Sequence, residues 1–298
     1  MNLGGTVPYI FHGEVWALIV GALALGWYGI KIIQPRAIAL GYPAITRKQK
    51  SLYLIAVATM WVMSDYPIHD VAENYLYVVH MVQHMFLSMI IPGLFVLSMP
   101  RWLLELVIPQ DSTAWRLLRK YTRPLWGLLI FNALTVTLHF PITVQVSADS
   151  GAAHFLLHLM VFVAGLLMWM PVIGPIREWH IAPLGKCMYL FAMSIVPTIP
   201  SGFLIFAEGI VYDHYDDAPV RLWGLSTLTD QTAAGLVMKL GGGFLLWAII
   251  VVIFARWASA ESRNEEEARR TRQKAARQPL TFETVAEEFA KTPAPTES

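Results

Sequence analysis

Apolar residues recur along most of this chain in runs that are long enough to cross a lipid bilayer as helices. A bilayer core requires about 20 mostly apolar residues per helix. The pattern predicts seven such runs, of which the second is the shortest: 13–33, 51–66, 75–98, 124–141, 152–172, 185–207 and 232–257. We therefore expect an all-α, polytopic membrane protein whose seven-helix bundle occupies residues 1–257. Residues 258–298 predict a charged tail that is partly disordered or helical.

The distribution of charge predicts how this bundle is oriented. Charged residues make up 14% of the chain and hydrophobic residues 56%, whereas soluble domains carry roughly 25% charged residues. Nearly all lysines and arginines between the spans follow the first, third and fifth spans, and the opposite connections carry only Arg221. The positive-inside rule then places the N-terminus outside and the C-terminus in the cytoplasm. The single Cys187 excludes an intrachain disulfide and a metal site built on paired cysteines.

Five histidines lie in the predicted spans, all in the half nearest the outer surface. His80 and His84 are four residues apart in the third span, which reads "VVHMVQHMFLSMIIPG". His154 and His158 repeat this spacing at the start of the fifth span, and His139 lies near the end of the fourth. Residues four apart share one helix face, so each pair can offer two imidazoles to one ion. We interpret the five side chains as a metal or cofactor site, although neutral imidazole suits copper, zinc, iron and nickel alike.

Methionines accompany the histidine pairs. Met81 and Met85 each follow a histidine by one residue, and Met238 lies in the seventh span. Thioether sulfur is a soft ligand that favours Cu(I), but methionine is also a common filler of apolar interiors. As a set, these residues tilt the interpretation towards copper.

Two carboxylates and one lysine border the same zone. Asp65 ends the second span, and Asp230 lies close to the start of the seventh. Each can be a helix cap or an acceptor that fixes the tautomer of a ligand histidine. Lys239 lies deeper in the seventh span, where it can reach outward to the interface or pair with either aspartate. The outer connections carry further polar residues, which could gather cations loosely but which we expect to be ordinary solvated loop: His69, Asp70, Glu73, Asp213, His214, Asp216 and Asp217.

Four stretches between residues 66 and 250 resemble the CtaG-type cytochrome c oxidase assembly factors. They read "HDVAENYLYVVHMVQHMFLSMIIPGLFVLSMP", "LHFP", "AHFLLHLMVFVAGLLMWMPVIGP" and "LTDQTAAGLVMKLGGG". The resemblance implies a multi-pass protein of the bacterial inner membrane that is linked to copper delivery to haem–copper oxidases of the respiratory chain. It also implies that the five histidines above are the family's histidines, and that Asp230 and Gln231 form its DQ element. Lys239 departs from the family pattern, which has an apolar or aromatic residue there.

The resulting hypothesis is a metallochaperone that binds Cu(I) through the histidines, with help from methionine, and releases it by ligand exchange. Its partners would be cytochrome c oxidase subunits or another copper chaperone, and the sequence leaves a homo-oligomer open. The net charge of +1 gives no indication of a nucleic-acid partner. No general base, nucleophile or phosphate-binding loop is recognisable, so we do not expect an enzyme. The alternative is a haem protein that transfers electrons, because imidazoles from two helices can be axial haem ligands.

Overall fold

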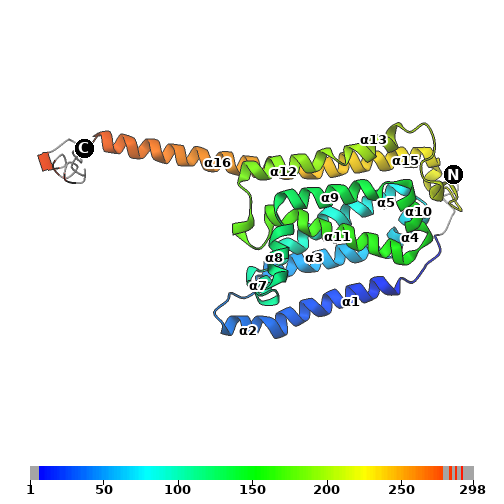
Figure 1. The fold of residues 1–298 in the computed structure, drawn as a ribbon, viewed down its shortest axis with the longest axis horizontal. Helices are drawn as coiled ribbons and strands as arrows, with labels where there is room; N and C mark the ends of the chain where they lie inside the picture. The colour runs from blue at the N-terminus through cyan, green and yellow to red at the C-terminus, as the bar shows by residue number, and fades with distance from the viewer. Residues whose placement is uncertain (1–6, 278–281, 284–285, 287–289, 291–298) are drawn as a thin grey trace. The chain divides into compact units, whose positions relative to one another are not determined.

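The computed structural model describes residues 7–277, 282–283, 286 and 290, and these residues form helices and connections without a β-strand (Figure 1). The chain divides into two compact units, Met1–Val251 and Val252–Ser298. The predicted tail is helical as far as Arg277, and most residues after it lie outside the described part. The helices and their bounds are α1 (Gly13–Tyr28), η1 (Gly29–Ile33), α2 (Gln34–Ala39), α3 (Arg47–Ser64), α4 (Ile68–Asn74), α5 (Tyr77–Met85), η2 (Phe86–Ile90), α6 (Ile91–Ser98), α7 (Arg101–Val107), α8 (Thr113–Tyr121), α9 (Pro124–Leu138), α10 (Pro141–Asp149), α11 (Gly151–Ile173), η3 (Arg177–Trp179), α12 (Pro183–Ile195), α13 (Thr198–Phe206), α14 (Asp213–Asp216), η4 (Leu222–Gly224), α15 (Thr227–Leu236), η5 (Val237–Gly241) and α16 (Gly242–Arg277).

Five helical segments among the described residues are long and apolar enough to cross a membrane: Gly13–Ala39, Tyr77–Ser98, Gly151–Ile173, Pro183–Phe206 and Thr227–Ala275. The pair α9 and α10 makes a sixth if its two parts, bent by 75°, count as one span. These helices confirm an all-helical, multi-pass membrane protein. The remaining predicted span lies in α3, which is not among these segments. The 18 residues of α3 include Arg47, Lys48 and Lys50, which make this helix more polar than the others. Seven spans and their orientation stay predictions.

The bend between α9 and α10 has a local cause. Pro141 begins α10 and has no N–H to continue the hydrogen-bond ladder of α9. Its ring also disfavours helical backbone at Phe140, which is extended, with φ −70° and ψ 135°. His139 ends α9 at this break. The helix therefore stops three residues before the predicted end of the fourth span.

The helix that carries His80 and His84 changes to the π-helical turn η2 directly after Met85. Beyond this point it packs closely on α11. Because Pro92 lacks an N–H, the carbonyl of Ser88 has no helical donor four residues later. Gly165 of α11 faces this carbonyl: a Cβ atom added to Gly165 would lie 2.1 Å from the Ser88 oxygen. One turn along α11, the indole N–H of Trp169 donates to the carbonyl of Met89 at 2.7 Å. The π-helical turn η2 and the missing side chain at Gly165 thus let the helix after α5 lie directly against α11.

Short elements cover the end of the bundle at which α5, α11 and α15 begin. α4 and α15 both pack on α5, and α10 packs on α11; Figure 1 shows α4, α5, α10 and α15 at this end. Tyr77, Tyr212 and Tyr215 are buried there in one apolar cluster with Met81 and Met238. This end is therefore a closed, packed part of the fold, although loops and short helices form much of it.

We predict that Gly165→Ala destabilises the bundle by about 1–3 kcal/mol, because the new methyl group must push α11 away from the Ser88 carbonyl. The thermal unfolding midpoint of the purified protein in detergent would fall. Gly202→Ala is the matched control, since Gly202 also lies in an apolar helix and has nothing within 4 Å of its added Cβ. Equal midpoints for the two variants would contradict this account of the helix contact.

Candidate metal centre

The first turn of α5, the helix with the first histidine pair, is capped by a carboxylate from another helix. Asp230 of α15 accepts hydrogen bonds from the backbone N–H groups of Tyr77, at 2.7 Å, and Val78, at 2.9 Å. The residue preceding the helix, Leu76, has no side chain that can do this. A carboxylate at this position satisfies two free donors and complements the positive end of the helix dipole. Asp230 thus joins α15 to the start of α5.

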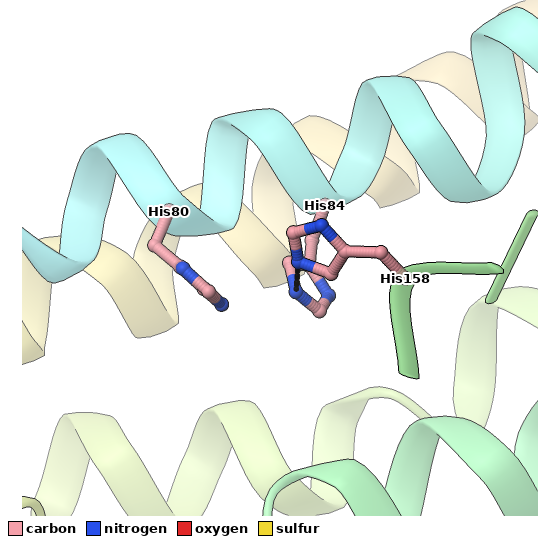
Figure 2. A group of neighbouring side chains, drawn as sticks. All are labelled: His80, His84 and His158. Carbon is pink, nitrogen blue, oxygen red and sulfur yellow. Dashed lines mark hydrogen bonds between the residues drawn. The ribbon is translucent and has the colours of Figure 1, made fainter. Parts of the chain in front are cut away.

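Three of the predicted histidines converge between α5 and α11 (Figure 2). His80 and His84 project from one face of α5 towards His158 of α11. The Nε2 atoms of His84 and His158 are 3.1 Å apart, and the ring centroids of His80 and His84 are 4.4 Å apart. One ligand nitrogen from each of the three residues lies within 4.8 Å of the other two. We call His80, His84 and His158 the trihistidine cluster.

The other two predicted histidines line the same cavity as the trihistidine cluster. His139 donates from Nδ1 to the carbonyl of Thr135 at 2.6 Å, so its neutral ring carries the lone pair on Nε2. His154 has its Nδ1 3.1 Å from the hydroxyl of Ser147, and its ring centroid is 4.2 Å from that of His158. All five histidines therefore meet at one cavity, while His139 stays outside the group whose ligand atoms are within 4.8 Å.

Several imidazole nitrogens at this cavity are buried and have no hydrogen-bond partner: His80 Nδ1, His139 Nε2 and His154 Nε2. An unsatisfied buried polar atom costs roughly 1–3 kcal/mol, and such atoms are rare in folded proteins. Three of them around one cavity indicate a site whose nitrogens are suited to an electron-pair acceptor. A metal ion is such an acceptor.

A second group of possible ligands lies beside the first, at α4. His69 and Glu73 of α4 and His154 of α11 each offer one ligand atom within 4.8 Å of the others. His69 and Asp70 are 8% and 2% exposed, so the prediction that these connection residues are solvated was wrong for this pair. The reason is that residues 68–74 form a helix that packs on α5. Asp213, Asp216 and Asp217 are exposed, as predicted, and His214 is half-buried.

Hydrogen bonds, nearby charges and burial shift the pKa values of several polar groups outside the spans. The hydrogen bond with His69 lowers the pKa of Glu73 below its usual value, and positive charge on His154 and His69 acts in the same direction. Burial opposes these effects. Burial raises the pKa of Tyr212 to about 12 and that of Tyr215 well above its usual value. Both phenols therefore keep their protons near neutral pH, and they donate to the carbonyls of His139 and Ala72 at 2.8 and 3.0 Å.

Comparison with known protein families gives one result, which agrees with the resemblance seen in the sequence. The family model described as cytochrome c oxidase caa3 assembly factor (Caa3_CtaG) matches residues 26–260. The chain belongs to this family. Searches of curated proteins and of solved structures gave no match.

In this assembly factor the two residues of the DQ element hold the fold around the histidines. Asp230 contacts neither a histidine nor the start of its own helix, which Ser226 caps; it caps α5 instead. Gln231 accepts from the N–H of Val211 at 2.8 Å and donates to the carbonyl of Gly209 at 3.3 Å. The element therefore ties α5 and the connection after α13 to α15.

The remaining candidates have structural partners. Asp65 ends α3 and accepts from the indole of Trp61 at 2.8 Å, and it does not line the histidine cavity. Lys239 bonds to the hydroxyl of Thr198, and no carboxylate pairs with it among the described residues. The predicted pairing of Lys239 with Asp65 or Asp230 is therefore not found in the described part of the chain.

The methionines border the histidines on the side away from α4. Met81 is 4% exposed and lines the histidine cavity. It also lines an adjoining cavity with Met85, Met89, Met193 and Met238. A row of thioethers thus leads away from the trihistidine cluster. Their arrangement allows a role as soft ligands, although Met81 and Met238 also belong to the apolar core.

Sequence reasoning missed the importance of α4. His69 and Glu73 are four residues apart, which is the same spacing that pointed to the other histidine pairs. Gln83, between His80 and His84, was also overlooked; it is fully buried, and its amide nitrogen lies 2.6 Å from the Met63 carbonyl and 3.1 Å from His69 Nδ1. The spacing of four residues was a signal from which His69 and Glu73 could have been found. The sequence contains no comparable signal for Gln83.

We predict that Asp230→Ala costs about 1–3 kcal/mol of stability, because two buried backbone donors at the start of α5 lose their acceptor. Asp230→Asn keeps one acceptor oxygen and should lose less. Thermal unfolding in detergent measures both, and amide hydrogen exchange at Tyr77 and Val78 should accelerate. Asp217→Ala, at an exposed aspartate, is the control; a loss as large as that of Asp230→Ala would contradict the capping role.

Proposed function

We propose that this assembly factor binds copper as Cu(I) at the trihistidine cluster and passes it to a cytochrome c oxidase subunit or to another copper chaperone. The observation that carries the proposal is the convergence of His80, His84 and His158, whose ligand nitrogens lie within 4.8 Å of one another. The family membership supplies the link to the oxidase. The protein would then be a metallochaperone rather than an enzyme.

The chemistry of the cluster supports a soft or borderline metal. Imidazole nitrogen binds copper readily, and the neighbouring thioether of Met81 adds a soft donor that favours Cu(I). The facing Nε2 atoms of His84 and His158 can share only one hydrogen in the neutral state. Both Nε2 atoms could bind copper if each neutral ring carried its hydrogen on Nδ1. Ligation by these two neutral tautomers would release no proton and would leave no charged imidazole in the apolar interior.

The size of the cavity favours an ion over a haem. The histidine cavity has a volume of about 40 Å³, whereas pockets for organic ligands measure roughly 300–1,000 Å³. A haem between α5 and α11 would need α11 to move away from the helix that carries His80 and His84. The direct packing of Gly165 on the Ser88 carbonyl opposes this movement. We therefore favour copper over the haem-binding electron carrier.

The proposed location is the bacterial inner membrane, with the N-terminus outside. In that orientation the start of α5 and α11 faces the outer side, so the histidine cavity would lie near the outer surface. The site is formed by side chains from separate helices and is not enclosed by four fixed ligands. Copper can then leave by exchange of one ligand at a time with a partner protein.

The binding test uses the purified full-length protein in detergent with Cu(I) and a colorimetric Cu(I) chelator as competitor. We expect His84→Ala to weaken Cu(I) binding at least tenfold, because a cluster of three nitrogens loses one that faces another at 3.1 Å. His180→Ala is the control, since His180 follows α11 at the opposite end and bonds to the Gly174 carbonyl. A Soret band that disappears in His84→Ala would instead support the haem protein.

The functional test is a deletion strain complemented with the wild-type or the His84→Ala/His158→Ala gene. We expect the double variant to give little oxidase activity at low copper and more activity when copper is added. Full activity from the double variant at low copper would refute delivery through this cluster. Normal oxidase assembly in the deletion strain itself would show that this oxidase does not need the protein.

A further inference from the structure

His69, Glu73 and His154 form a compact group outside the trihistidine cluster. Nε2 of His69 lies 3.2 Å from one carboxylate oxygen of Glu73, and Nδ1 of His154 lies 3.9 Å from the other. The ring centroids of His69 and His154 are 5.5 Å apart. One ligand atom of each residue falls within 4.8 Å of the other two. The carboxylate therefore lies between two imidazoles that come from different helices.

The burial of this group distinguishes it from an ordinary surface ion pair. His69 and His154 are 8% and 7% exposed, and the buried Nε2 of His154 has no hydrogen-bond partner. Exposed histidine–carboxylate contacts are common and worth little. A buried imidazole nitrogen without a partner is uncommon and costly. In His154 this nitrogen is Nε2, whereas Nδ1 faces Glu73 and Ser147.

Neighbouring groups hold the three side chains in place. The buried amide of Gln83 contacts His69 at 3.1 Å, and the hydroxyl of Ser147 contacts His154 at 3.1 Å. The ring of His12 packs edge-on against His69, with centroids 4.7 Å apart. These contacts restrain the side chains: the Gln83 amide, which also donates to the Met63 carbonyl, donates to Nδ1 of His69. The group is thus preorganised by contacts outside itself.

We propose that His69, Glu73 and His154 form a second metal site, which takes a divalent transition-metal ion. Two imidazole nitrogens and one carboxylate oxygen are a borderline-to-hard donor set that suits Zn²⁺ and Cu²⁺. The trihistidine cluster has no oxygen donor and lies beside thioethers, so the two sites differ in the metals they prefer. The second site goes beyond the proposed function and does not depend on it.

Both sites open on one cavity and share a boundary. Glu73 and His154 line the same cavity as the trihistidine cluster, and the His154 ring lies 4.2 Å from that of His158. Each cluster nevertheless has three ligands of its own, with no residue in common. The protein can therefore hold two ions at once, and removal of one set of ligands should leave the other.

The test is the Zn²⁺ content of the purified full-length protein after equilibrium dialysis in detergent. We expect two ions per chain in the wild type and one in each of His69→Ala, Glu73→Gln and the double variant His84→Ala/His158→Ala. Adding Glu73→Gln to that double variant should weaken binding of the remaining ion at least tenfold. Glu208→Gln, at an exposed carboxylate outside both groups, is the matched control and should bind two.

Two results would overturn the second site. One is a wild-type protein that binds no Zn²⁺, and the other is unchanged stoichiometry in both His69→Ala and Glu73→Gln. Far-ultraviolet circular dichroism and the unfolding midpoint establish that each variant is folded, and Glu73→Gln preserves the size of the side chain. Loss of the second site would leave Cu(I) binding at the trihistidine cluster intact, so failure of this proposal is distinguishable from failure of the proposed function.

Discussion

The close contact of α11 with η2, the turn that continues α5, positions the candidate metal centre. Pro92 removes one N–H from the helix and leaves the carbonyl of Ser88 without its usual partner. Gly165 offers no side chain, so α11 can lie against that carbonyl. Two turns earlier on α11, His158 consequently reaches His84. A feature that would weaken an isolated helix thus permits two helices to share a polar site in an apolar bundle.

Burial makes such a site demanding, because every polar atom in it needs a partner. The fold meets part of this demand with contacts within a helix and with contacts between helices. Asp230 satisfies the start of α5, Thr135 accepts from His139, and Gln83 contacts His69. The imidazole nitrogens that remain without partners among the described residues belong to side chains that line one cavity. The polar groups are therefore divided into those that hold the helices and those that face the cavity.

The helices, and the residues that share one face of each helix, could be predicted from the sequence. The rotation of each helix about its axis, which decides what that face meets, could not. The spacing of His80 and His84 was enough to place both on one face, and the hydropathy of their span was enough to predict a helix. Which imidazole of α11 would face them depends on contacts such as that of Gly165, and a single sequence contains no direct signal for these. His139 was expected in the same group, and it lines the cavity but lies outside the compact cluster.

Short polar segments were harder to interpret than long apolar ones. Residues 68–74 look like a charged connection, and their burial arises because α4 packs on α5 and brings His69 to His154. Asp230 was expected to cap its own helix or to hold a histidine. Ser226 caps that helix instead, and no side chain of the preceding residue caps α5, so Asp230 accepts from the first N–H groups of α5.

In the two proposals, a small change of donor separates two tasks within one cavity. The three nitrogens at α5 and α11 lie beside methionine sulfur, so this position suits a soft monovalent ion. Beside α4, Glu73 adds a negative oxygen whose ionisation is assisted by His69. That charge offsets part of the cost of bringing a divalent cation into a buried setting. A cation that enters from the side of α4 would thus meet the carboxylate first, and the neutral, softer nitrogens would select among the ions that lie deeper.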